Sequence, residues 1–153
     1  MASKVVPANL TVTISETITL NEKDEGSVRT FNIANINQVT HRIINVPASQ
    51  IVLCSFGAAN GRGDYVFGDV QYVRVTNLDA LNFVTLRFLG ENTTDFAVRL
   101  DAGMSYLIGE NDADITGVDD YCDTGGVNLE KLTSINALAD TAAVNLEMFV
   151  ACK

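Results

Sequence analysis

Apolar and polar residues alternate with a period of two along much of the chain, most regularly over residues 10–20. Successive side chains of a β-strand point to opposite sides, so this alternation predicts a long, half-buried strand with one solvated face. Threonine suits the solvated face, because its branched carbon fits the pleat while its hydroxyl stays in water. The apolar face carries Leu10, Val12, Ile14, Ile18 and Leu20.

Turn-forming segments separate further alternating stretches at intervals of about ten to fifteen residues, a spacing typical of sandwiches and barrels. No window shows an apolar stripe at helical spacing with a cap at both ends. We therefore predict an all-β fold, an antiparallel β-sandwich of jelly-roll-like type with nine or ten strands, in a single domain over residues 1–153. The predicted strands are 10–20, 28–36, 40–46, 50–56, 65–76, 82–89, 95–100, 104–108, 131–138 and 143–151.

The predicted strand 65–76 is apolar on both faces. An outer strand face normally meets water, so a second apolar face suggests contact with another subunit. We therefore expect a homo-oligomer. One face would carry Tyr65, Phe67, Val73 and Val75, and the other Val66, Val70 and Tyr72.

Composition and charge narrow the possible partners. Of the 153 residues, 47% are hydrophobic, which excludes disorder of the whole chain, and 10 basic against 19 acidic residues give a net charge of −9. Such a surface repels phosphate backbones and anionic lipid, so we expect neither nucleic acid nor a membrane as a partner. No apolar signal-peptide core follows Lys4, and no apolar stretch is long enough to span a bilayer, so we expect synthesis in a cytoplasm.

Three cysteines occur at spacings that match no zinc or redox motif. An odd number argues against a closed disulfide framework, so Cys54, Cys122 and Cys152 are interpreted as free thiols. Cys54 alternates with Val52 and Phe56 in an apolar strand, which predicts that its thiol is buried in the core.

The segment 110–126 is strongly acidic, with six carboxylates and no basic residue. Its oxygen-bearing residues have the spacing of a calcium-binding loop, with a glycine, Gly117, at the sixth position. The last ligand position holds Asp instead of the usual Glu, and the flanking segments do not read as helices. Two interpretations stay open, a calcium site and a solvated acidic loop, and no cofactor is expected. The ligand positions would be Asp112, Asp114, Thr116, Asp120 and Asp123.

Catalytic signatures are scarce. A nucleophilic triad needs a base within hydrogen-bond reach, and the single histidine, His41, lies in a predicted strand without a nucleophile motif nearby. The tripeptide Arg62-Gly63-Asp64 occurs in integrin ligands but is too short to indicate adhesion by itself. We expect that the protein is not an enzyme.

Three short segments carry a recognisable pattern. Residues 73–88 form a strand that ends in Asn77-Leu78-Asp79, a turn at Asn82-Phe83 and a second alternating strand. A Leu-x-Ala-Gly-x-Ser turn follows at residues 100–105, and Ala139-Asp140-Thr141 lies between the last two strands. These segments resemble hairpins of structural proteins from tailed-bacteriophage virions, and together they cover roughly the second half of the chain.

The resemblance implies a virion protein of β-sandwich type, without catalytic residues to carry over. The expected function is that of a non-enzymatic capsid cement or decoration protein that braces neighbouring capsid subunits. Its partners would be the major capsid protein or other virion proteins, and its location the virion after synthesis in the host cytoplasm. With this role the expected homo-oligomer is a closed homotrimer.

A second function class stays open, a carbohydrate-binding or receptor-binding β-sandwich module such as a head fibre or tail component. Such a module would use the loops 57–64 and 110–126. Glycan binders usually present aromatic platforms, and few aromatic residues lie in or beside these loops. They are Tyr65, Phe67 and Tyr121.

Overall fold

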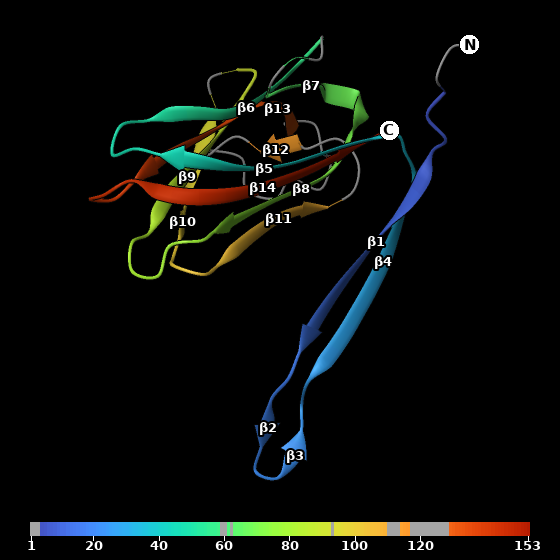
Figure 1. The fold of residues 1–153 in the computed structure, drawn as a ribbon, viewed down its shortest axis with the longest axis vertical. Helices are drawn as coiled ribbons and strands as arrows, with labels where there is room; N and C mark the ends of the chain where they lie inside the picture. The colour runs from blue at the N-terminus through green and yellow to red at the C-terminus, as the bar shows by residue number, and fades with distance from the viewer. Residues whose placement is uncertain (1–3, 59–60, 62, 93, 110–113, 117–128) are drawn as a thin grey trace.

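The computed structural model describes residues 4–58, 61, 63–92, 94–109, 114–116 and 129–153. It consists of a body of two packed sheets and a long two-stranded arm that projects from one end of the body (Figure 1). Within the described residues the only helical segment is the short 3-10 turn η1 (Phe67–Asp69). The predicted all-β sandwich is thereby confirmed.

The body contains a four-stranded sheet and a larger sheet packed against it. The four-stranded sheet has the order β11 (Ser105–Gly109), β8 (Val70–Asn77), β14 (Val144–Cys152), β5 (Gln38–Val46). The larger sheet has the order β10 (Asp95–Leu100), β9 (Val84–Gly90), β13 (Leu129–Ala139), β6 (Ile51–Gly57), β7 (Asp64–Val66), and β12 (Asp114–Thr116) also pairs with β13. Neighbouring strands are antiparallel except β6 and β7.

The order of the eight main strands is that of a jelly roll. The chain changes sheet from β5 to β6, β7 to β8, β8 to β9, β10 to β11, β11 to β12 and β13 to β14. The strands exceed the predicted nine or ten, because the arm is built from β1 (Ala8–Glu16), β2 (Thr19–Leu20), β3 (Lys23–Asp24) and β4 (Ser27–Ile36), and because β7 and β12 are additional short strands.

Two turns that were expected to close hairpins instead connect the two sheets. The turn at residues 100–105 joins β10 to β11, and the turn at Ala139-Asp140-Thr141 joins β13 to β14, and each pair lies in opposite sheets. The alternation of these strands is the same in both arrangements, because every strand of either sheet turns one face inward. The alternation of apolar and polar residues therefore predicts where the strands lie, but not which strands pair with each other.

The inner faces of both sheets form one apolar core. Phe88 stacks on Phe96 with ring centroids 4.7 Å apart and contacts Tyr106 at 5.1 Å. Such aromatic pairs stabilise by about 0.5–1.5 kcal/mol beyond the area that they bury. Other core residues with at most 2% exposure are Val46, Leu53, Val73, Leu86, Leu132, Ile135, Leu146 and Met148.

The Asn77 side chain stabilises the corner between the two sheets, where the chain passes from β8 to β9. It is fully buried and donates to the carbonyls of Asn82 and Leu100, at 2.9 and 3.1 Å, and accepts from the amide of Asp79 at 2.9 Å. Asp79 in turn accepts from the amides of Leu81 and Asn82, which lower its pKa. The Asn-x-Asp pattern is therefore explained by local turn chemistry.

The predicted strand 65–76 is interrupted. The turn η1 separates β7 from β8, so Tyr65 and Tyr72 lie in different sheets. Both side chains are buried, Tyr65 in the inter-sheet core and Tyr72 against the base of the arm. The second apolar face is thus covered at Tyr72 by a segment of the same chain, and not by the second subunit that the sequence suggested.

Cys54 is buried with 1% exposure, as predicted, and Cys152 is buried as well, while Cys122 lies outside the described residues. Val52 was expected on the same face but is 58% exposed. The reason is a β-bulge in β6. Cys54 lies opposite Ile135, but the next residue of β13, Asn136, lies opposite Val52, so Leu53 is an extra residue in β6.

Replacement of Asn77 by Ala should lower the free energy of unfolding by about 2–4 kcal/mol, because two buried carbonyls and one amide lose their partner. Urea unfolding measures the change. Asn145→Ala is the matched control, since it removes an exposed contact with Asn45 and should change stability by less than about 0.5 kcal/mol. Equal losses in both variants would contradict the role of the corner.

Cys54 and Cys152 should resist thiol reagents in the native protein. Burial raises the pKa of Cys54 to about 12 and that of Cys152 to about 11, so the reactive thiolate is scarce at neutral pH. In a Cys122→Ser variant, a chromogenic disulfide reagent should release colour only after denaturant is added. Rapid reaction of the folded variant would refute the assignment.

Candidate assembly surfaces

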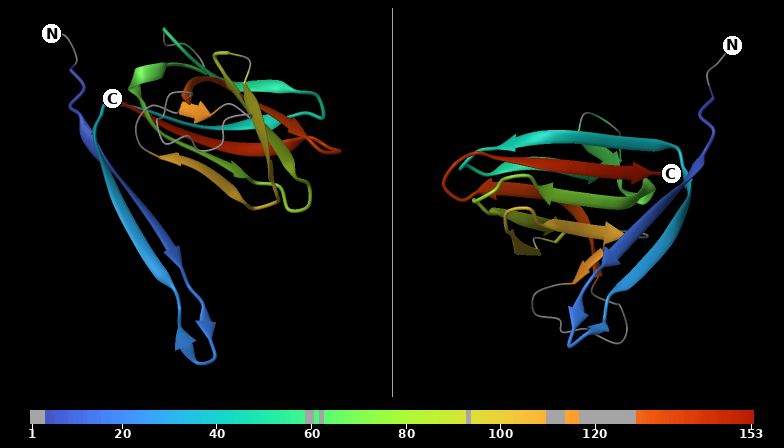
Figure 2. Two further views of the ribbon diagram at one scale, coloured as in Figure 1. Left: turned by 180° about the vertical axis from the view of Figure 1, so that it is seen from behind. Right: turned by 60° about the horizontal axis from the view of Figure 1, so that its bottom comes forward.

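The base of the arm is fixed to the outer face of the four-stranded sheet. Ile33 and Ile36 of β4 form a buried cluster with Tyr72 of β8 and Ala151 of β14. Gly109 of β11 lies beneath the Phe31 ring, where an added Cβ would stand 3.6 Å from a ring carbon. Leu10, Val12, Phe31 and Phe149 pack around this cluster. The arm therefore leaves the body at the end of the sheet near the C-terminus (Figure 2).

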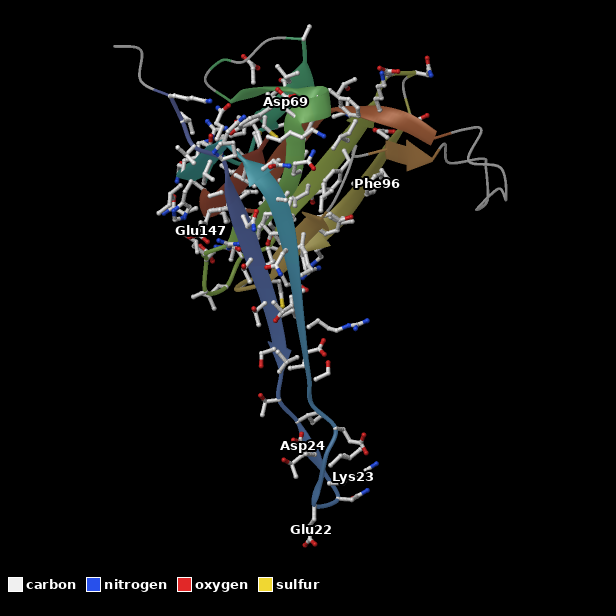
Figure 3. All side chains as sticks on the ribbon, turned by 90° about the vertical axis from the view of Figure 1, so that its right-hand side faces the viewer. Glu22, Lys23, Asp24, Asp69, Phe96 and Glu147 are labelled. Carbon is white, nitrogen blue, oxygen red and sulfur yellow. The ribbon has the colours of Figure 1, made fainter. Side chains whose placement is uncertain are left out.

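Beyond this base the arm is a free ribbon. Every side chain of residues 13–25 and 27–30 is exposed, including Ile14, Ile18 and Leu20 at 41%, 53% and 58%. The prediction of a half-buried strand over residues 10–20 is therefore wrong beyond Val12, because the apolar face continues where the body has ended. We call residues 14–29 the distal arm; Figure 3 shows it extending away from the body, with Glu22, Lys23 and Asp24 at its tip.

Local chemistry shapes the distal arm. Asn21 and Glu22 both have positive φ, 49° and 66°, which is the two-residue turn that suits a twisted hairpin. A Cβ on Gly26 would stand 2.4 Å from the carbonyl oxygen of Glu16, so glycine is required where the two strands approach. Ser27 donates to Glu16 at 2.5 Å across the same point. The arm is thus a defined structure along its whole length.

A second uncovered surface lies at the edge of the sandwich formed by β5 and β6. Among the described strands β5 pairs only with β14, so its outer backbone edge is free. Val39 and Ile43 of β5 are 52% and 65% exposed, and Val52 of β6 is similarly exposed. We call these three side chains, the free edge of β5 and the adjoining hollow the β5 edge surface.

The hollow has a volume of about 580 Å³ and lies between residues 40–45 of β5 and the loop around Gly61 and Gly63. Arg42 lines this hollow and donates from Nη2 to the carbonyl of Leu53, the bulge residue of β6. Gly63 has φ 87°, and an added Cβ would stand 3.1 Å from the Arg42 guanidinium. The bulge and this glycine together make room for the guanidinium at the edge.

Beside the hollow, the buried Arg42 Nε finds no hydrogen-bond partner among the residues that the structure describes. Burial raises the pKa of Tyr65, while the nearby Thr40 hydroxyl and Arg42 oppose that shift. Unsatisfied buried polar atoms cost stability unless water or a partner reaches them. The buried Nε of Arg42 therefore carries such a cost at the β5 edge.

The outer face of the four-stranded sheet carries a polar network. Glu147 of β14 accepts from His41 Nε2 of β5 at 2.7 Å and from Arg74 Nη1 of β8 at 2.6 Å. Arg74 also contacts the Thr76 hydroxyl, which lies 2.7 Å from the Ser105 hydroxyl of β11. His41, expected to be an ordinary strand residue, is the edge member of this network, and the hydrogen bonds from His41 and Arg74 lower the pKa of Glu147.

The calcium-loop hypothesis falls mostly outside the described residues. Asp112, Asp120 and Asp123 are not described, and Asp114 and Thr116 are placed only as backbone in β12. Among the described residues, no group of three or more His, Cys, Asp or Glu side chains is placed to hold a metal ion.

Of the tripeptide 62–64, Arg62 is likewise outside, while Gly63 and Asp64 border the hollows at the β5 edge. A search for membrane-crossing helices in the described residues finds no candidate. The surfaces that stand out in the structure are thus the arm and the β5 edge, neither of which the sequence analysis singled out.

Comparisons with known proteins add little. No protein-family model matches the chain, and no curated protein matches it. Among solved structures, the chain is similar to one from the disulfide-linked pili of Bacillus endospore appendages, with a TM-score of 0.42 and 9% sequence identity. The match covers 100% of this chain and 95% of the other.

Replacement of Glu147 by Gln should make stability less sensitive to acid. Because His41 and Arg74 lower the pKa of Glu147 in the folded state, its contribution is present above the ordinary carboxyl pKa and is lost as the pH falls through the lowered value. Urea midpoints measured from about pH 6 to pH 3 should fall less in the variant than in the wild type. Glu22→Gln at the arm tip is the control and should keep the wild-type profile.

Proposed function

We propose that this protein is a non-enzymatic structural component of a phage particle, a decoration protein that attaches to the outer shell and braces neighbouring capsid subunits. The single observation that carries the proposal is the projecting arm, a hairpin with a defined structure whose distal side chains do not contact the body. Its partners would be the major capsid protein or other virion proteins, and its location the virion.

The physical argument concerns the stability of the arm. An isolated two-stranded hairpin is marginally stable in water, because it lacks a third strand or a packed face. Here the distal arm also exposes Ile14, Ile18 and Leu20. Burial of such a side chain stabilises by about 1.5–3 kcal/mol, so contact with a partner would strongly favour the arm in its extended form. An arm of this kind suits assembly.

Two further features agree with an assembly role. The segments that resemble virion structural proteins, 73–88, 98–108 and 137–147, lie in strands and connecting turns of the body, away from the arm. The body and the arm also offer two separate contact regions, and a protein held at two points gains avidity without a new kind of contact. Such attachment would stabilise a shell against the internal pressure of packaged DNA.

Particles purified from cells that express this chain provide the test. We expect the protein in the particle fraction after density-gradient centrifugation, with immunogold label on the outer shell. Label confined to the tail would favour the receptor-binding alternative, and protein found only outside particles would contradict the proposal.

An arm-shortened variant sharpens this test. In it an Asn-Gly turn replaces residues 14–29 and joins Thr13 to Thr30, which face each other in the register of β1 and β4. It should fold, because the cluster at the arm base stays intact, and should fail to bind particles assembled without the protein. Leu81→Asp, at a side chain that is 89% exposed on the body, is the control and should bind normally.

A further inference from the structure

We propose that the distal arm of one chain docks on the β5 edge surface of a second copy of this chain. This inference names one partner of the arm. It rests on the proposed role in assembly, but not on the proposal that the assembly is a phage particle.

Both surfaces are apolar and uncovered in the single chain. The arm face that carries Ile14 is continuous with the face whose Leu10 and Val12 pack at the arm base, because alternate residues of a strand share a side. That base already packs on the outer face of the four-stranded sheet, of which β5 is the edge. A second copy presents the same kind of sheet surface, uncovered, at Val39 and Ile43.

Backbone hydrogen bonding favours the same pairing. In the described residues, β1 and β4 pair only with each other and β5 pairs only with β14, so each has a free edge. A nine-residue edge strand with exposed apolar side chains is a template for another strand. A strand of the arm that paired with β5 would extend the four-stranded sheet. The free backbone groups of β5 and of that arm strand would then hydrogen-bond to each other.

The charges of the two surfaces are complementary. The distal arm carries four acidic residues, Glu16, Glu22, Asp24 and Glu25, against Lys23 and Arg29. Strand β5 carries no acidic residue, in a chain with a net charge of −9, and its one permanently charged side chain is Arg42. The nearest acidic groups are Glu147, which accepts from His41 on the outer face, and Asp64, which borders a hollow beside Arg42. An acidic arm is therefore better placed against β5 than against an average part of this surface.

The contact must be made between copies. Strand β4 passes through Asn37 directly into β5, and the buried cluster at the arm base directs the arm away from the body (Figures 1 and 2). The arm cannot fold back on its own β5 edge while that cluster stays packed. An arm-to-edge contact is heterologous, so repetition produces a closed ring or an open chain, and the expected homotrimer would be the ring of three.

Complementation between two defective variants tests this arrangement. The arm-shortened variant keeps the β5 edge surface, and an Ile43→Asp variant keeps the arm. By sedimentation velocity at micromolar concentration, the wild type should associate and each variant alone should sediment as a monomer, with association weakened about tenfold or more. A mixture of the two variants should form a heterodimer, since one intact arm meets one intact edge. Leu81→Asp should associate as the wild type does.

Each other outcome overturns the inference. A monomeric wild type would mean that the arm serves another partner. Loss of association in both variants without rescue in the mixture would mean that an intact arm and an intact β5 edge do not bind each other. Association of the arm-shortened variant alone would indicate edge-to-edge contact. Association of the Ile43→Asp variant alone would place the arm elsewhere on the second copy.

This experiment uses the purified chain without particles, and it is therefore independent of the virion proposal. A protein that self-associates but is absent from particles would leave the inference standing and remove the proposed function. A protein that decorates particles as a monomer would do the reverse.

Discussion

The buried cluster at the base of the arm is the contact on which the rest of the architecture depends. Ile33 and Ile36 are held against Tyr72 and Ala151, and this small second core sits on the outside of a sheet whose inside already forms the main core. Full burial of such side chains stabilises by about 1.5–3 kcal/mol each. This is enough to hold the base of the arm in one orientation on the sheet. Without this cluster the hairpin would be a flexible extension of β5.

Much of the body was predictable from alternation, because its strands are half-buried and period two is the signature of that state. The corner at Asn77 was visible as an Asn-x-Asp pattern, and its turn chemistry explains why that pattern stood out. The pairing of strands was not predictable, since a turn such as 139–141 can close a hairpin or connect two sheets with the same residues on either side. Pairing is decided by the whole core and not by the local sequence.

The candidate surfaces escaped prediction for a related reason. Alternation over residues 10–20 shows which side chains share a face but not whether anything covers that face, so an arm and a core strand look the same in sequence. The bulge at Leu53 exposes Val52 and leaves the Leu53 carbonyl free to accept from Arg42. It could not be predicted either, because one extra residue in an apolar strand does not change the composition of that strand.

The same edge shows how packing inside the sandwich shapes recognition outside it. Because the bulge turns a carbonyl toward Arg42, the guanidinium is held beside β5 and not released into solvent, and Gly63 is needed so that the neighbouring loop can approach it. The edge thus keeps a fixed positive charge next to an exposed Ile43 and a free backbone ladder. Free edges are usually blunted by exposed charge or by Pro, whereas β5 keeps a half-buried Arg42 and the exposed apolar side chains Val39 and Ile43. These features are the reason that we propose the acidic distal arm of a second copy, which has free edges of its own, as the partner of this edge.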